Sequence, residues 1–474
     1  MTFDSLAFAL FLSVVFPLYA LVPRWSSKKN ILLVASAVFY SAWNPLFLSL
    51  LAFTTLFDWW AALRIYRATT SACRRRWFWA SIIASLSLLG YFKYAQFLAD
   101  IAVDGLSFFG VHFKPIDLGI VLPLGISFYI FESISYVTDV YKKRVVPTTN
   151  LRDYGLFMTF FPHLVAGPIM RFADFDTQAT TPRRVTLDGV SSGLFMAVCG
   201  LFLKIVAADQ LFAPTANAVF LPEFRPDGAS AWLGAFAFSM QVYCDFAGYS
   251  LTALGVAKMF GFHLPANFEA PFSSVGIAEL WTRWHISLST WLRDYVFNPL
   301  GNYRHGRWRG YFNVLITFSA CGLWHGAAWN FVVWGALHGV MLIGERVLKT
   351  YFGAWSLWQR LPVRVALGLL TFALFTLAVV FFRAPTLSLA WVRCKAMLGF
   401  PGSDAQALAW SGETLTCILA LFLGLLTQFW LRDRRGWDWL PCIAWSLRCA
   451  ALTCMLVAVV LSGDAGIPFI YFQF

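Results

Sequence analysis

Long apolar runs recur along this sequence and limit its fold more than any other feature. A helix needs about 20 predominantly apolar residues to cross a bilayer. The runs that approach or exceed this length occupy residues 6–21, 31–57, 77–98, 118–141, 190–212, 232–260, 311–343, 365–382, 414–431 and 443–461. Hydrophobic residues make up 59% of the chain and charged residues 13%, against roughly 45–50% and 25% in soluble domains. The sequence therefore predicts an all-α, polytopic membrane protein.

The charge of the chain fits a membrane protein whose basic residues lie in cytoplasmic loops. The formal net charge is +12, from 36 basic and 24 acidic residues, and loops that stay inside are enriched in Lys and Arg. We expect contact with membrane lipid and not with nucleic acid, since no basic patch is interleaved with aromatic residues. The nine cysteines contain no CxxC pair, which argues against a disulfide framework or a zinc ribbon.

Two apolar runs contain helix-breaking residues. Asn44-Pro45 divides the run at residues 31–57, so we expect two short helices that cross out and back between basic loops at 24–29 and 64–76. Residues 161–169 (FPHLVAGPI) hold two prolines and a glycine, which indicates a broken or re-entrant segment. The acidic stretch at residues 100–117 is expected to form a loop on the outer side.

A histidine lies inside one of the apolar runs, at residues 321–329 (CGLWHGAAW). An ionisable side chain at bilayer depth is costly, so His325 is a functional-site candidate, and imidazole can transfer protons near neutral pH. Gly322 and Gly326 leave room for another backbone or a thin substrate to approach it. The structural alternative is that His325 only hydrogen-bonds a neighbouring helix.

Residues 277–295 have the pattern of one amphipathic helix at a membrane interface or beside a polar funnel. Its apolar positions recur at helical spacing, and its polar positions fall on the other side. His285 is expected at the edge of the apolar stripe. A further histidine, His338, follows His325 by thirteen positions, about 20 Å along an uninterrupted helix. A bend between these two would be needed before they could act together.

Common catalytic signatures are missing from the chain. There is no GxxxxGK[ST], GxGxxG or HExxH sequence. The spacing of the histidines matches no metal-ligand pattern, so we expect no metal site. Histidine-assisted group transfer is the chemistry that remains.

Two long motifs in this order resemble the membrane-bound O-acyltransferase family. They are residues 281–295 (WTRWHISLSTWLRDY) and 322–327 (GLWHGA). Weaker similarity extends to residues 125–129, 161–169, 243–249, 382–384 and the aromatic C-terminus. Within the family, the chain is similar to bacterial exopolysaccharide O-acetyltransferases that act on alginate or cellulose.

The resemblance implies a single domain built as a ring of about 11–13 tilted and re-entrant helices around a central funnel. Residues 1–150 would supply N-terminal spans, 151–345 the catalytic core with both histidine motifs, and 346–474 C-terminal spans. The donor would be acetyl-CoA or another acyl thioester, used as a substrate, and no cofactor is expected. The protein would lie in the bacterial inner membrane and pass acetyl groups to a periplasmic acetyltransferase or acceptor beside a polysaccharide synthase.

The resemblance also suggests roles for single residues. His325 maps onto the family's catalytic histidine, as a base or less readily as an acyl carrier. His285 would position the donor or orient its helix. Arg283, Arg293 and Arg304 could bind donor phosphates or act as membrane anchors. Asp245 could hold an imidazole or tyrosine, or pair for structure alone. The other predicted substrate-contacting positions are Tyr243, Trp284, Asp294, Tyr295 and Trp324.

Two other functions are also compatible with the sequence. A D-alanyl transferase acting on teichoic acids would share the same plan but would depend on a carrier-protein donor. A transporter that passes an acetylated precursor without chemistry would be expected to show inverted repeats with paired broken helices.

Overall fold

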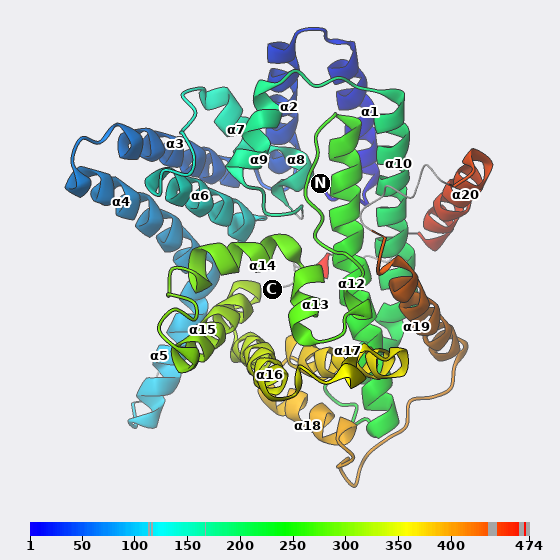
Figure 1. Cartoon of the computed structure of the whole chain (residues 1–474). Helices are drawn as coiled ribbons and strands as arrows, with labels where there is room; N and C mark the ends of the chain where they lie inside the picture. The colour runs from blue at the N-terminus through cyan, green and yellow to red at the C-terminus, as the bar shows by residue number, and fades with distance from the viewer. Residues whose placement is uncertain (112–113, 115–116, 166, 435–442, 464–468, 471–474) are drawn as a thin grey trace. The chain divides into compact units, whose positions relative to one another are not determined.

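The fold is helical throughout the part of the chain that the structure describes. This computed structural model describes residues 1–474 apart from 112–113, 115–116, 166, 435–442, 464–468 and 471–474. Within those residues the only β-type pairing is an isolated bridge between Pro226 and Gln406. The predicted all-α class is therefore confirmed (Figure 1).

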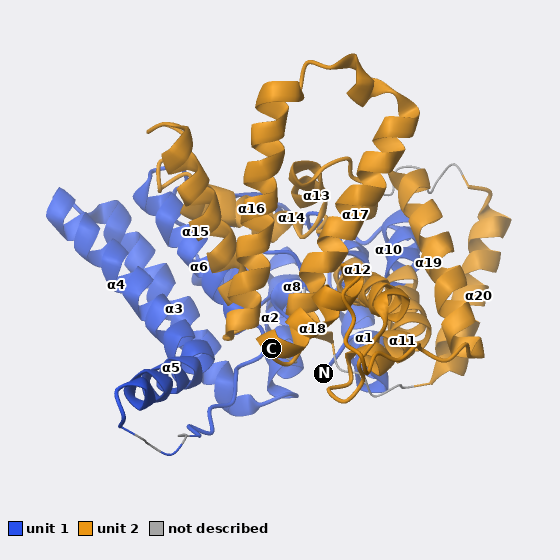
Figure 2. Cartoon of the chain, turned by 90° about the horizontal axis from the view of Figure 1, so that it is seen from below, with its two compact units in different colours: residues 1–197, 253–265 blue, residues 198–252, 266–474 orange. Residues whose placement is uncertain are grey.

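The chain divides into two compact units, and the first comprises residues 1–197 and 253–265 (Figure 2). Its elements are α1 (Leu6–Leu21), α2 (Trp25–Ser41), α3 (Pro45–Arg67), α4 (Ser71–Leu89), the π-helical η1 (Gly90–Tyr94), α5 (Ala95–Phe108), α6 (Ile126–Tyr141), α7 (Leu151–Thr159), α8 (Phe161–Leu164) and α9 (Phe172–Thr180). Helices α3, α4 and α6 pack against one another, and α7 packs against α2 and α9.

The second unit comprises residues 198–252 and 266–474. It contains η2 (Phe202–Phe212), α11 (Ala213–Phe220), η3 (Pro271–Ser273), α13 (Ile277–Arg283), α14 (Ile286–Leu292), η4 (Arg293–Phe297), α15 (Arg307–His325), α16 (Trp329–Phe352), η5 (Ser356–Gln359), α17 (Leu361–Arg383), α18 (Leu387–Met397), α19 (Gly412–Leu431) and α20 (Trp445–Ser462). Two further helices, α10 (Leu187–Leu201) and α12 (Gly228–Met259), contribute residues to both units.

Seven helical stretches among the described residues are long and apolar enough to cross a membrane. They are residues Pro45–Arg67, Ser71–Phe108, Leu187–Phe220, Trp329–Phe352, Leu361–Arg383, Gly412–Leu431 and Trp445–Ser462. The protein is thus a multi-pass membrane protein. The larger number of about 11–13 crossing and re-entrant helices, their ring arrangement and the three-part domain division stay predictions.

Local sequence signals explain the two predicted breaks. The side chain of Asn44 accepts a hydrogen bond from the amide of Leu46 and caps α3, with Pro45 at the first helical position. The segment at 161–169 is broken, because among its described residues only Phe161–Leu164 is helical. The acidic loop predicted at residues 100–117 is shorter than expected. Helix α5 continues to Phe108, so Asp100 and Asp104 are helical.

Candidate active site

His325 is the last residue of α15, and the chain turns directly after it. Gly326 and Ala328 have extended backbones, with φ of −157° and −151°, and α16 begins at Trp329. Residues 307–352 therefore form a helical hairpin, and the bend that His325 and His338 would need is present. Helices α15 and α16 pack side by side (Figures 1 and 2).

Glycines bring the two arms of this hairpin into backbone contact. A Cβ atom on Gly322 would lie 2.0 Å from the carbonyl oxygen of Phe331, and one on Gly335 would lie 2.1 Å from that of Phe318. Real Cβ atoms do not approach so closely, so both positions require glycine here. The prediction that a second backbone approaches Gly322 is confirmed. This close packing fixes the position of His325 at the end of α15.

The prediction of one continuous helix over residues 277–295 is wrong. Helix α13 ends at Arg283 and α14 begins at Ile286, and His285 between them has φ 41° and ψ 54°. The left-handed region is uncommon for a residue with a Cβ atom, so surrounding contacts must hold it there. The kink turns the ring inward. His285 is 0% exposed and does not lie at the edge of an apolar stripe.

Asn267, which the sequence did not single out, holds this kink. Its carbonyl oxygen accepts a hydrogen bond from the amide of Ile286 at 3.0 Å. Its side-chain oxygen accepts one from Ser287 Oγ at 2.6 Å, and its side-chain amide donates to Ser250 Oγ on α12 at 3.2 Å. Because these bonds join α12 to the start of α14, Asn267 stabilises the strained backbone of His285.

The two motif histidines lie close together in the second unit. The ring centroids of His285 and His325 are 6.2 Å apart, and Trp324 is 5.7 Å from His285 and 4.9 Å from His325. Phe246 lies edge-on to His285 at 4.6 Å, and Phe382 lies 5.3 Å from His325. His325 is 3% exposed. Two imidazoles from separate motifs thus face each other inside an aromatic shell.

Tyr243 and Trp284 belong to an aromatic cluster that reaches His285 through Phe268 and Phe246. Their rings are 6.3 Å apart, and Phe268 and Phe272 pack between 5.1 and 5.8 Å from each of them. Trp284 is buried and Tyr243 is half-buried. The structure therefore brings both predicted residues into the same cluster, on α12 and at the end of α13.

Asp245 lies in a buried ion-pair network. Its Oδ1 is 2.7 Å from Nζ of Lys204, which also lies 3.0 Å from Asp209. Its Oδ2 accepts a hydrogen bond from the amide of Ile470 at 2.8 Å, and the neighbouring Phe469 ring is 4.3 Å from that of Tyr249. These contacts fit the structural alternative for Asp245. They also show that the described part of the aromatic C-terminus docks on α12.

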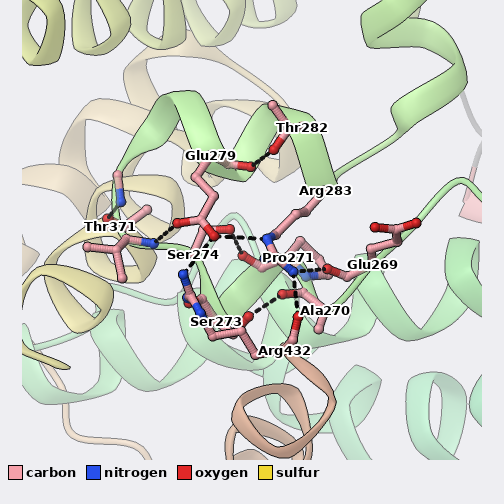
Figure 3. Close-up of polar contacts among 12 residues, drawn as sticks. Glu269, Ala270, Pro271, Ser273, Ser274, Glu279, Thr282, Arg283, Thr371 and Arg432 are labelled. Atoms are coloured by element: carbon pink, nitrogen blue, oxygen red, sulfur yellow. Dashed lines mark hydrogen bonds and ion pairs between the residues drawn. The ribbon is translucent and has the colours of Figure 1, made fainter. Parts of the chain in front are cut away.

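Arg283 lies in a polar network that ties α13 to the end of α19 (Figure 3). Its Nε is 3.0 Å from Glu279 Oε1, and its Nη1 donates to the carbonyl oxygens of Glu269 and Arg432. Arg432 Nη2 is 2.7 Å from the same Glu279 oxygen. Burial by itself raises the pKa of Glu279. The amide N–H of Val275 and the two guanidinium groups outweigh burial and hold that pKa below its ordinary value.

The remaining predicted donor-binding residues lie toward the surface. The Arg293 side chain is 60% exposed and pairs with Asp294 at 2.9 Å. Tyr295 is half-buried, with its ring 5.2 Å from that of Trp291. Arg304 is exposed in the loop before α15. Arg293 and Arg304 therefore have guanidinium groups accessible to an anionic ligand, whereas Arg283 is held by protein groups.

A model of the membrane-bound O-acyltransferase family matches residues 32–382. The chain belongs to this family. It is therefore an acyltransferase, as the motifs around His285 and His325 predicted. The probable alginate O-acetylase of Azotobacter vinelandii is 42% identical over 405 residues, which cover 84% of this chain and 78% of that protein.

Two other similar acyltransferases carry different names. The peptidoglycan O-acetyltransferase of Helicobacter pylori is 34% identical over 78% of this chain and 74% of its own length. The teichoic acid D-alanyltransferase of Streptococcus thermophilus is 30% identical over 46% of this chain and 56% of its own length. The similarity to the two O-acetyl-transferring proteins thus extends over much more of the chain.

Proposed function

We propose that this membrane-bound O-acyltransferase works in the bacterial inner membrane and O-acetylates an exopolysaccharide, with alginate as the first candidate polymer. The acetyl group would come from a cytoplasmic thioester, acetyl-CoA, and pass to a periplasmic partner. Support comes from the alginate O-acetylase similarity over 84% of the chain. The chain belongs to an acyltransferase family, which supports a transferase over a passive transporter.

The observation that carries the proposal is the 6.2 Å separation of the His285 and His325 rings. These residues are forty positions apart, and the kink after α13 and the turn after α15 bring them together. A group-transfer site needs a base near the acceptor and a second group near the donor. Burial in an aromatic shell would also exclude bulk water, which would otherwise hydrolyse the thioester.

In the proposed reaction His325 accepts the proton of the acceptor hydroxyl as its oxygen attacks the thioester carbonyl carbon. The new C–O bond forms, the carbonyl oxygen takes the negative charge, and the tetrahedral intermediate then breaks its C–S bond. The sulfur leaves as a thiol after receiving the proton from His325. His285, 6.2 Å away, would position the thioester.

The rival with specific support is D-alanyl transfer to teichoic acid, because one similar protein has that name. Its match covers only 46% of the chain. Transfer of acetyl from acetyl-CoA by the purified protein would support O-acetylation. Transfer only of D-alanine, from a carrier-protein thioester, would support the rival.

The test uses the purified full chain, a labelled acetyl thioester and the isolated periplasmic acceptor. His325→Ala should abolish acetyl transfer while the protein still inserts and elutes from size exclusion as the wild type does. Retained transfer by His325→Ala would remove this residue from the mechanism. A cell strain carrying the variant should also produce polymer without acetyl groups.

A further inference from the structure

Two buried N–H groups lie on one face of α16, and the ring that carries one of them contacts His325. Trp334 and His338 are four positions apart on this helix, so their side chains project from the same face. Trp334 is 3% exposed and His338 is 0% exposed. The centroid of the Trp334 ring is 5.1 Å from that of His325 and 4.9 Å from that of His338.

A third ring fixes which nitrogen of His338 carries its proton. Trp281 Nε1 donates a hydrogen bond to His338 Nδ1 at 3.4 Å. An indole N–H can only donate, so Nδ1 must be the unprotonated nitrogen, and a neutral imidazole then carries its proton on Nε2. Rings of Trp281, Trp334 and Phe375 surround His338. A charged imidazole would be costly among such apolar rings, which favours the neutral form.

Both N–H groups lack an acceptor among the described residues. Neither Trp334 Nε1 nor His338 Nε2 has a hydrogen-bond partner there, although both atoms are buried. Leaving a buried donor unsatisfied costs about 1–3 kcal/mol, and native structures rarely retain two such groups without a reason. These two N–H groups therefore need an acceptor, and a bound ligand could supply it.

We propose that Trp334 Nε1–H and His338 Nε2–H bind the carbonyl oxygen of the acyl group that is transferred at His325. This inference rests on the proposed function. When the acceptor oxygen attacks the thioester carbon, the carbonyl π electrons move onto the carbonyl oxygen, and the two N–H groups stabilise the resulting negative charge. When the C–S bond breaks, the electrons return to re-form C=O, so neither donor loses its proton.

The acyl oxygen fits these donors better than the other substrate atoms do. The acceptor hydroxyl must give up its proton, so it needs a base, and His325 supplies one. The leaving sulfur needs a proton that His325 has just received. Only the carbonyl oxygen gains charge without needing proton transfer, and fixed N–H donors are suited to that task.

The first test compares variants that remove or keep a donor. Trp334→Phe and His338→Phe remove one N–H group each while keeping an aromatic ring, and His338→Gln supplies an amide N–H. We expect each Phe variant to lower kcat about 100- to 1,000-fold with little change in donor KM, and His338→Gln to retain clearly more activity than His338→Phe. Trp308→Phe, at a ring that is 75% exposed, is the matched control.

The second test detects the hydrogen bonds directly. His325→Ala, which should bind donor without turning it over, is mixed with acetyl-CoA that carries ¹³C at the thioester carbonyl. Isotope-edited infrared spectra should show the bound carbonyl band at lower wavenumber than in water-free solvent. Adding Trp334→Phe or His338→Phe should return the band toward higher wavenumber, whereas a merely structural role would leave it unmoved.

The outcomes separate this inference from the proposed function. If His325→Ala abolishes transfer while Trp334→Phe keeps wild-type kcat, the proposed function stands and the donor role is wrong. An unmoved carbonyl band, or equal loss in His338→Gln and His338→Phe, also overturns the donor role. If His325→Ala retains transfer, the proposed base fails, and the Trp334→Phe kinetics still report on the donors.

Discussion

Each unit holds a buried histidine, and the two differ in their neighbours: His163 lies beside a carboxylate, whereas His325 is the residue that we propose as the base. His163 in the first unit is 1% exposed, and its Nδ1 is 3.2 Å from Glu132 Oε1. The same Glu132 oxygen accepts a hydrogen bond from the amide of Met170 at 2.8 Å. His163 and Glu132 thus connect α8 and α6 to the broken segment that follows α8.

His325 in the second unit is equally buried but has different neighbours. Its ring is surrounded by Trp324, Trp334, Phe382 and His285 at 4.9–6.2 Å. The nearby donor on Trp334 lacks an acceptor among the described residues. Burial is therefore shared by both histidines and does not by itself distinguish the proposed base from His163. The difference is that His163 lies beside the carboxylate of Glu132, whereas His325 lies beside the imidazole of His285 and the indole of Trp334.

The largest expected effects come from removing the rings of His325 and His163. Loss of the first should lower activity, and loss of the second should lower stability. His325→Ala should lower acetyl transfer by about 10²–10⁴-fold, the usual value of a general base, with a small change in thermal stability. His163→Ala should leave Glu132 with the amide of Met170 but without the imidazole, and should cost about 1–3 kcal/mol of stability. Transfer rates of the purified variants, per folded molecule, and unfolding midpoints in detergent measure both. The comparison fails if His163→Ala is as inactive as His325→Ala while remaining stable.

A smaller loss of activity is expected when the hydrogen bonds that hold the backbone of His285 are removed. Asn267→Ala removes the hydrogen bonds to Ser287 and Ser250, each worth about 1–3 kcal/mol when a buried partner is left unsatisfied. Freed from this constraint, His285 should leave its position, and transfer should fall about tenfold, since 1.4 kcal/mol is a factor of ten. Initial-rate measurements test this.

Asn313→Ala is the matched control for this prediction. Asn313 is 0% exposed and donates to the carbonyls of Leu300 and Asn302, away from His285. It should lose similar stability and much less activity. Equal activity losses in the two variants would mean that Asn267 acts through general stability.

Two arginines with the same sequence-based role should behave differently. Arg283→Ala breaks the network with Glu279 and should lower stability by about 1–3 kcal/mol. Arg293→Ala should leave stability unchanged within about 1 kcal/mol, since exposed pairs contribute little. If Arg293 binds donor phosphates, its loss should raise the acetyl-CoA KM several-fold, with a smaller difference at high salt. An unchanged KM at low salt would leave Arg293 as an anchor.

The smallest expected effect is a loss of stability at acidic pH. Because the folded-state pKa of Glu279 lies below its ordinary value of 4.5, its contribution to stability is present above pH 4.5 and is lost as the pH falls through the lowered pKa. The unfolding midpoint of the wild type should therefore fall more steeply below pH 4.5 than that of Glu279→Gln. Thermal unfolding at several pH values between 7 and 3 measures the two slopes. Parallel slopes would contradict the role of Glu279.

Sequence reasoning succeeded where the signal is local. Apolar runs predicted the helices, because burying a helix in lipid depends only on the composition of that segment. Asn44-Pro45 predicted the start of α3, because a cap and a proline act on their immediate neighbours. The motifs around His285 and His325 predicted the acyltransferase family, since they are long and occur in the expected order.

The sequence pattern could not predict contacts between segments that are distant along the chain. The helical spacing of residues 277–295 favoured one helix, yet Asn267 and the aromatic shell hold a left-handed residue at His285, a tertiary effect that overrides local periodicity. The pairing of Trp281 with His338 likewise depends on the turn after His325. The sequence by itself determined a helical membrane acyltransferase with two motif histidines. Only the tertiary structure decided that their rings meet and that Trp334 contacts both His325 and His338, because non-local packing sets those distances.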